Sequence, residues 1–178
     1  MFNSAYRQPS PMAIPASPRI IAITGSPGVG KTTLCNSLSD VTTVEELASR
    51  MGALGSMCSD GAKEVDLEMM IKQWPEKVAK FIDGHLSHHL PVDAIVILRC
   101  NPVELERRLN ERGYSQNKVR ANVEYEMLGG PWQDLLEDER PIIELDNSSF
   151  AANLVSWLNE DCPNRSSPDS AIDWLSQL

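Results

Sequence analysis

The chain has 178 residues, of which 42% are hydrophobic, and it carries a formal charge of −9 at pH 7. This length can close one hydrophobic core, so we expect one compact domain rather than two. The acidic balance disfavours binding to nucleic acid through a broad basic surface and suits a basic protein partner better. The lack of a run of about eighteen apolar residues disfavours a membrane span.

We also expect a cytoplasmic location, with the nucleus as a second location if the source is a eukaryote. The sequence begins without the basic start and apolar core of a secretory signal. The cysteines form no C-x-x-C pair, so reduced thiols are expected rather than a zinc knuckle or a disulfide framework. They are Cys35, Cys58, Cys100 and Cys162.

The first part of the chain predicts a strand, a glycine turn and several helices. Residues 1–18 are rich in proline and show no helical or strand period, so we expect a disordered extension. "RIIAIT" predicts a strand and "KTTLCNSLSD" a helix. Two more helices are expected at "TVEELASRMG" and "DLEMMIKQW", the second capped by Asp66 and ended before Pro75. The connector 53–65 between them is predicted to be mobile.

Strands alternate with helices in the second part of the chain. The predicted strands are "VAKFID", the almost wholly apolar "DAIVILR", and "RPIIELD". The predicted helices are "NPVELERRLNERG", "VRANVEYEML" and "FAANLVSWLNE", followed by a linker and a short amphipathic tail. This alternation predicts a three-layer α/β fold with a parallel sheet of about five strands and helices on both faces.

The glycine turn contains the pattern G-x-x-x-x-G-K-T of a phosphate-binding loop, between the first strand and the first helix. Its glycines let backbone N–H groups turn inward around phosphates, Lys31 reaches the β and γ oxygens, and the Thr32 hydroxyl is a ligand for Mg²⁺. The alternative is a glycine turn with an incidental lysine. We expect phosphate contacts from Gly25, Ser26, Gly28, Val29, Gly30, Lys31, Thr32 and Thr33.

Such a loop requires a carboxylate at the end of a neighbouring strand to hold Mg²⁺. Asp83 ends the predicted strand "VAKFID" and is our candidate, although an aspartate there is also a common turn residue. His85 is a candidate for positioning water or moving a proton, and the alternative is a packed histidine. His88 and His89 are predicted to be structural, because adjacent side chains point apart on a helix or strand.

Arg108 and Arg112 lie four residues apart on a predicted helix and therefore share one face. Arginine matches phosphate oxygens and stacks on bases, so the pair could close over a nucleotide. The alternative is a solvated face in which Glu104 pairs with Arg108. GTP binding is disfavoured, because "NKVR" places Arg120 where a guanine-reading motif requires aspartate, and no D-x-x-G occurs.

Taken together, "ITGSPGVGKTT", "IDGHLSHHLPVD", "ILRCNPVELERRLNERGYSQNKV" and "NVEYEML" resemble the adenylate kinase 6 family. The resemblance covers roughly 19–160 and implies a nucleoside monophosphate kinase fold and an ATPase that helps mature the small ribosomal subunit. It implies an AMP-side segment at about 41–74 and a lid at about 111–121, with 161–178 left as a tail. The residues it implies are Gly28, Gly30, Lys31, Thr32 and Thr33 for ATP, Arg112 in the lid, Asp83 and His85 as a D-x-H pair, and Arg50 for AMP.

Two functions compete. In the first, an enzyme converts Mg-ATP and AMP into two ADP, with Lys31 and Arg112 neutralising charge. In the second, an ATPase uses Asp83 and His85 to organise water, and hydrolysis changes its affinity for a basic small-subunit ribosomal protein. A small-metabolite kinase is a third possibility. The expected cofactor is Mg²⁺, and the expected ligands are ATP and AMP or another nucleoside monophosphate.

Overall fold

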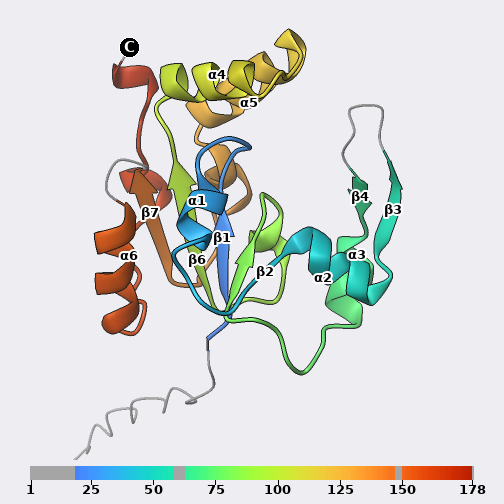
Figure 1. The fold of residues 1–178 in the computed structure, drawn as a ribbon. Coiled ribbons are helices and arrows are strands. Elements are labelled where there is room, and N and C mark those ends of the chain that lie inside the picture. The colour runs from blue at the N-terminus through green and yellow to red at the C-terminus, as the bar shows by residue number, and fades with distance from the viewer. Residues whose placement is uncertain (1–18, 58–62, 147–149, 178) are drawn as a thin grey trace, which may run out of the picture.

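The structure of the protein is a computed structural model that describes residues 19–57, 63–146 and 150–177 (Figure 1). Its centre is a five-stranded sheet in the order β2-β5-β1-β6-β7, and every neighbouring pair is parallel. The strands are β1 (Ile21–Thr24), β2 (Val41–Thr43), β5 (Phe81–Asp83), β6 (Ala94–Arg99) and β7 (Ile142–Asp146). The predicted parallel sheet is therefore confirmed.

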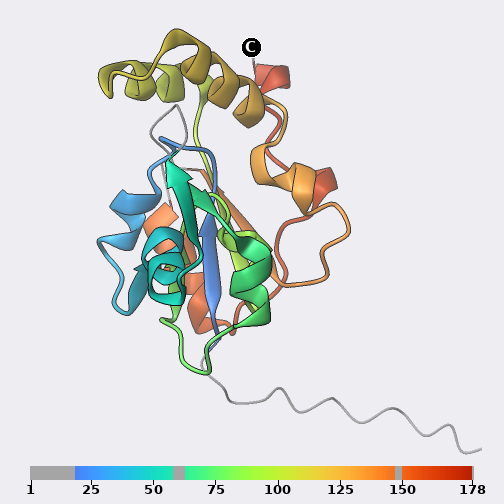
Figure 2. The same ribbon diagram turned by 90° about the vertical axis from the view of Figure 1, so that its right-hand side faces the viewer.

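Helices cover both faces of this sheet (Figures 1 and 2). One face carries α1 (Lys31–Cys35) and α6 (Phe150–Asn159), and the other carries α2 (Val44–Met51) and α3 (Leu67–Lys72). Helices α4 (Pro102–Glu111) and α5 (Gln116–Met127) lie beyond the carboxyl ends of the strands, at the top of Figure 1. The short 3₁₀ turns are η1 (Ser87–His89), η2 (Gly130–Asp134), η3 (Pro168–Ser170) and η4 (Leu175–Gln177). The predicted three-layer fold is confirmed.

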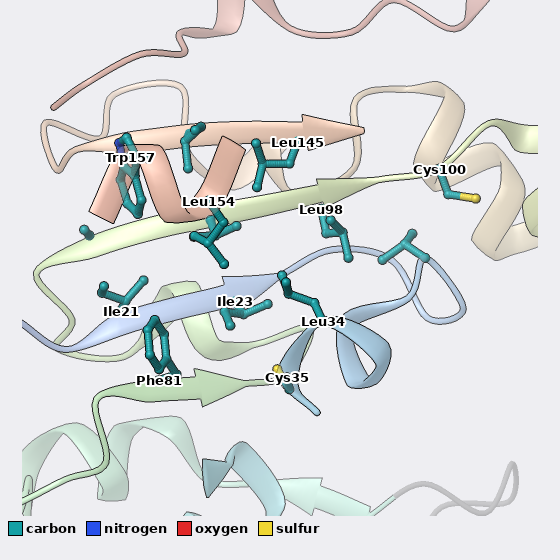
Figure 3. Packing of buried hydrophobic residues seen from close by; sticks show 14 of the residues in the cluster. Ile21, Ile23, Leu34, Cys35, Phe81, Leu98, Cys100, Leu145, Leu154 and Trp157 are labelled. Carbon is teal, nitrogen blue, oxygen red and sulfur yellow. The ribbon is translucent and has the colours of Figure 1, made fainter. Parts of the chain in front are cut away.

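Two apolar clusters lie on opposite faces of the sheet. Ile21 and Ile23 of β1 join the cluster beneath α1 and α6, whereas Ala22 joins the other, as the alternation of a strand requires. Figure 3 shows Trp157 of α6 packed in the first of these clusters. Strand β6 is buried at every position, which explains its almost unbroken apolar sequence. Burial of each isoleucine side chain in β1 and β6 contributes about 1.5–3 kcal/mol to the stability of the fold. The ends of these strands are therefore firmly held.

The connector at 53–65, for which no strand was predicted, contains two strands that form an antiparallel hairpin. They are β3 (Leu54–Met57) and β4 (Lys63–Val65). Leu54 pairs with Val65, and both side chains pack against the second apolar cluster. Burial of this apolar pair orders a segment whose polar composition suggested a loop. Residues 58–62, including Cys58, lie outside the described residues.

Two predicted elements are shorter than their sequences suggested. Helix α1 ends at Cys35 rather than near residue 40. The hydroxyl of Ser37 donates to the carbonyl of Leu34 (2.7 Å), and such bonds compete with helix continuation. Strand β5 begins at Phe81 rather than at Val78. The carboxyl end of β5 and the amino end of α1, which position the predicted site, are placed as expected.

The segment after residue 161 packs along the outer edge of β7 instead of forming a free linker. The N–H groups of Arg165 and Ser166 donate to the carbonyl of Ile142 (3.0 and 3.1 Å). The N–H of Glu144 donates to the Ser166 hydroxyl (2.9 Å), and Trp174 is buried. The tail thus covers a sheet edge that would otherwise present unpaired backbone groups.

The predicted extension 1–18 lies outside the described residues. Among the helices of the described part of the chain, none has the length and apolar character needed to cross a membrane.

Candidate active site

The loop between β1 and α1 can adopt its shape only with glycine at particular positions. Gly25 has a φ of +143°, and a Cβ there would lie 2.3 Å from the carbonyl oxygen of Leu98. Gly30 has a φ of +111° at the start of α1. Both conformations are unfavourable for residues with a Cβ, so the glycine spacing of the motif fixes the course of the loop.

Lys31 folds back across this loop. Its Nζ donates to the carbonyls of Gly25 (2.8 Å) and Ser26 (3.0 Å). Burial lowers the pKa of Lys31 to about 8, although the negative charges of Asp83 and Glu126 oppose this shift. The ammonium group is therefore held in place by the two carbonyls and has lost part of its hydration, which favours a further interaction with an anion such as phosphate.

Asp83 lies at the end of β5, next to the loop, because β5 pairs with β1 and Asp83 stands opposite Ile23. The carboxylate is 8% exposed, and its Oδ1 has no hydrogen-bond partner among the described residues. Burial raises the pKa of Asp83, while Lys31 and a hydrogen bond from Cys35 oppose that shift. A buried carboxylate oxygen without a partner is costly unless a cation or proton joins it.

This donor set fits Mg²⁺. The Thr32 hydroxyl lines the same cleft as Asp83, and hydroxyl and carboxylate oxygens are ligands that Mg²⁺ accepts while it keeps several waters. The unpartnered Oδ1 of Asp83 is the observation that supports an ion here.

The loop and Asp83 open into a cleft of about 630 Å³. The other walls of the cleft are formed by residues of the second apolar cluster, by the β3–β4 hairpin and by the start of α5. Of the predicted residues, those lining it are Gly28, Gly30, Lys31, Thr32, Thr33, Asp83, His85 and Arg112. Gly25, Ser26 and Val29 are buried within the loop and do not line the cleft. Tyr114, Lys118, Glu45, Lys63 and Glu64 also line the cleft and were not predicted.

His85 lies two residues beyond Asp83 and faces the same cleft. The side chain is exposed to solvent on one side, but loss of hydration in the cleft lowers the pKa of its imidazole, and the charges of Lys31 and His89 act in the same direction. The ring is therefore neutral at pH 7 and able to accept a proton. Its backbone is held by the Thr24 hydroxyl, which donates to the His85 carbonyl (3.1 Å).

The two predicted arginines of α4 behave differently. Arg108 forms the expected ion pair with Glu104 (2.7 Å) and approaches the loop carbonyls of Gly28 and Val29 only at 3.5 and 3.4 Å. Arg112, at the end of α4, lines the cleft. Arg108 thus pairs within α4 and lies near the loop, whereas Arg112 and Lys118 both line the cleft.

Comparison with known proteins shows the family of the chain. Residues 21–129 match the family described as an AAA domain. The chain is 39% identical over 137 residues to a Pyrococcus abyssi protein named "Putative adenylate kinase", covering 73% of this chain and 76% of that protein. It is 33% identical over 170 residues to an Archaeoglobus fulgidus protein of the same name, covering 89% and 93%. The chain belongs to this adenylate kinase-like family.

A solved structure, a gluconokinase from Sinorhizobium meliloti 1021, has the same fold with a TM-score of 0.52 at 15% identity. The match covers 82% of this chain and 94% of that one. It supports the fold, a P-loop kinase architecture, and carries no information about the substrate.

The structure does not bring Arg50 to the cleft of this adenylate kinase-like protein. Its guanidinium donates to the Thr42 hydroxyl (2.6 Å) and, from Nε, to the Glu46 carbonyl (3.4 Å). It lines a separate hollow with Asp40 and Thr42. The basic residue of this segment that does line the cleft is Lys63, whose Nζ lies 2.8 Å from Glu45 Oε1.

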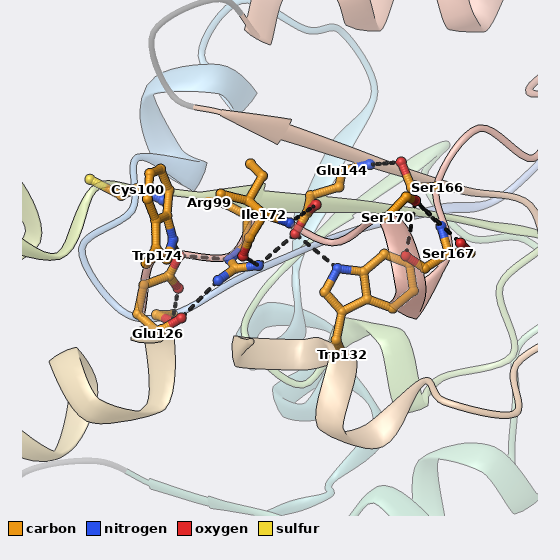
Figure 4. Close-up of polar contacts among 11 residues, drawn as sticks. Arg99, Cys100, Glu126, Trp132, Glu144, Ser166, Ser167, Ser170, Ile172 and Trp174 are labelled. Carbon is orange, nitrogen blue, oxygen red and sulfur yellow. Dashed lines mark hydrogen bonds and ion pairs between the residues drawn. The ribbon is translucent and has the colours of Figure 1, made fainter. Parts of the chain in front are cut away.

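A buried polar network beneath the adenylate kinase-like cleft was missed by the sequence reasoning (Figure 4). Arg99 Nε donates to Glu126 Oε1 (2.7 Å), and both side chains are 0% exposed. The other oxygen of Glu126 accepts from the Ser26 hydroxyl of the loop (2.5 Å). Oε1 also accepts from the indole of Trp174 (3.2 Å), and Arg99 pairs with Glu144 (2.5 Å). The sequence did contain one signal of this network, because the charged residue Arg99 ends an otherwise apolar strand.

Proposed function

We propose that the protein transfers the γ-phosphoryl group of Mg-ATP to a nucleoside monophosphate, forming two ADP from ATP and AMP. Hydrolysis of ATP accompanies this transfer. The observation that carries the proposal is the unpartnered Oδ1 of Asp83, which lies in the cleft that also receives Lys31 and Arg112. The names of the related archaeal proteins support the same activity.

Phosphoryl transfer depends on positioning and charge more than on covalent chemistry, and each cleft residue has a place in it. Lys31 leaves the carbonyls of Gly25 and Ser26 for the β and γ oxygens of ATP. Arg112 balances the charge that develops on the transferred group, and the lid at about 111–121 excludes water. Mg²⁺, held by Thr32 and Asp83, supplies further charge neutralisation when bound.

The monophosphate is assigned to the wall formed by the AMP-side segment, about 41–74. Lys63 is the only cation among the described residues of this segment that lines the cleft. Arg50 belongs to the separate hollow and does not support a monophosphate contact in this conformation.

A second function, ATP hydrolysis that serves small ribosomal subunit assembly, is favoured by His85. Its imidazole is neutral at pH 7 and lies beside Asp83, where it can orient an attacking water. In this reading, a basic ribosomal protein is the partner of the acidic surface. A small-metabolite kinase has no comparable observation in its favour.

A product assay separates these functions. ADP and inorganic phosphate are measured together, with ATP alone and with ATP plus AMP. ADP formation that requires AMP supports the kinase, whereas phosphate release without AMP supports the ATPase. His85→Ala should lower hydrolysis at least about tenfold with little change in ATP affinity. Unchanged hydrolysis in this variant would remove His85 from the reaction.

Lys31→Ala should lower both activities at least about 100-fold, because the charge opposite the transferred group is lost. Lys77→Ala is the matched control, since Lys77 is exposed and outside the cleft, and it should retain the wild-type rates. Equal rates in Lys31→Ala and Lys77→Ala would contradict the proposed site.

A further inference from the structure

A second cluster of potential ligands lies outside the nucleotide cleft. It consists of His88 and His89 on η1 and Asp134 on η2, and one ligand atom of each lies within 4.8 Å of the others. None of the three residues lines the nucleotide cleft. The prediction that His88 and His89 point apart is wrong, because η1 is a 3₁₀ turn in which their ring centroids are 4.0 Å from each other.

We propose that His88, His89 and Asp134 form a binding site for a divalent transition-metal ion of the zinc type.

The distances between the ligand atoms suit tetrahedral coordination. Zinc bonds of 2.0–2.1 Å to nitrogen and oxygen place neighbouring tetrahedral ligands ~3.3 Å apart. Asp134 Oδ2 lies 3.4 Å from His88 Nε2 and 3.8 Å from His89 Nε2. The ligand nitrogens of His88 and His89 lie within 4.8 Å of each other, so rotation of the side chains is needed to bring all three atoms to one ion. Two imidazoles and one carboxylate are also a ligand set of catalytic-type zinc sites, which keep a fourth position for water.

A hydrogen bond on the far side of His88 prepares its Nε2 as a ligand. Nδ1 lies 2.8 Å from the Thr24 hydroxyl, and the same hydroxyl lies 3.1 Å from the His85 carbonyl. In the tautomer in which the hydroxyl donates to that carbonyl, its oxygen accepts from Nδ1–H, and the Nε2 lone pair faces the Asp134 carboxylate 3.4 Å away, ready for an ion. In the other tautomer Nε2–H donates to Asp134, and a bound ion replaces that proton. A histidine whose outer N–H is fixed in this way is typical of metal ligands.

The surroundings admit an ion. His88 is 2% exposed, whereas the side chains of His89 and Asp134 are 37% and 45% exposed, so the site opens to solvent on one side. Arg140 is the nearest fixed cation, with Nη2 donating to the His88 carbonyl (2.8 Å). Its charge is matched by Asp138, which accepts from Nε at 2.9 Å and from Nη2 at 2.5 Å.

A bound ion would join η1, which follows Asp83 and His85, to η2, which follows the lid helix α5. We therefore expect it to stabilise the fold by linking the strand that carries the magnesium ligand with the chain that leaves α5.

The test uses untagged protein stripped with a chelator and titrated with Co²⁺ alone, without nucleotide. One equivalent should produce visible d–d bands of a tetrahedral site, without the thiolate charge-transfer band that a cysteine ligand would give. Zn²⁺ should displace Co²⁺ and raise the melting temperature. Absence of these bands, or binding with no defined stoichiometry, would overturn the proposal.

Variants at the two exposed ligands keep the buried His88 and so preserve the core. His89→Ala and Asp134→Asn should each weaken Co²⁺ binding at least about tenfold and abolish the zinc-dependent rise in melting temperature. His85→Ala and the exposed Asp169→Asn are the matched controls, and both should bind Co²⁺ as the wild type does. Wild-type binding by His89→Ala, or equal losses in Asp169→Asn and Asp134→Asn, would overturn the site. Circular dichroism confirms that each variant is folded.

Discussion

The charge of Lys31 depends on what occupies the cleft. In the ligand-free protein, burial holds its pKa at about 8, well below the usual value for lysine. A triphosphate brings several negative charges to the Nζ atom, and such charges raise the pKa of an ammonium group. Because the bound state then holds more protons than the free state, binding takes up a proton, and affinity for ATP falls as the pH rises above about 8.

At pH 8 about half of the Lys31 side chains are charged, so we expect uptake of about half a proton for each ATP bound. Titration calorimetry in two buffers with different ionisation enthalpies measures this number. Uptake should approach zero near about pH 6.5, where Lys31 is already charged.

Lys31→Arg is the control for this experiment, because arginine stays charged at every pH used. This variant should bind ATP without taking up a proton at position 31. The same uptake in Lys31→Arg and in the wild type would show that another group takes up the proton.

Glu126 of helix α5 makes a polar contact with the loop between β1 and α1. Its carboxylate accepts from Ser26 of the loop, from Arg99 of β6 and from Trp174 of the tail. Arg99 has no contact with solvent and depends on Glu126 and Glu144 for its charge balance. Removing one member of such a buried group leaves an uncompensated charge, which costs far more than losing a surface pair.

Glu126→Gln should therefore lower the free energy of unfolding by about 3–5 kcal/mol, measured by urea denaturation at pH 7. Glu124→Gln is the matched control on the same helix. Glu124 pairs with Arg120 at the surface, where the two side chains are 55% and 80% exposed, and its loss should cost less than about 1 kcal/mol. Similar losses in the two variants would contradict the role of Glu126.

Sequence reasoning predicted the elements whose signals are local. The apolar run of β6, the Asp66 cap and the glycine spacing of the loop are each contained in a few neighbouring residues, and the structure places these elements as expected. Asp83 could be named because a parallel sheet puts the ends of adjacent strands side by side.

The features that were missed depend on residues distant in the chain. Arg99, Glu126 and Trp174 meet only after β6, α5 and the tail have packed together. The pairing of Leu54 with Val65 depends on the apolar layer that covers both side chains, and Asp134 reaches His88 across 46 residues. Such contacts produce no periodic pattern in the local sequence from which they could be predicted.

Across the whole molecule, the sheet order places the loop after β1 between Asp83 on β5 and the buried network at the end of β6. Helices α4 and α5 lie above this edge and the β3–β4 hairpin lies to one side of it (Figure 1), and both contribute residues to the wall of the cleft. We propose that this edge binds a triphosphate, with Mg²⁺ held by Asp83.

Titration calorimetry with ATP, in the presence and absence of Mg²⁺, tests that claim most directly when wild type, Asp83→Asn and the exposed control Asp169→Asn are compared. We predict that Mg²⁺ tightens ATP binding about tenfold or more in the wild type and in Asp169→Asn, since the buried Oδ1 gains its missing partner. Asp83→Asn should lose this gain and bind metal-free ATP at least as tightly as the wild type. A full magnesium effect in Asp83→Asn, or no ATP binding by the wild type, would contradict the account.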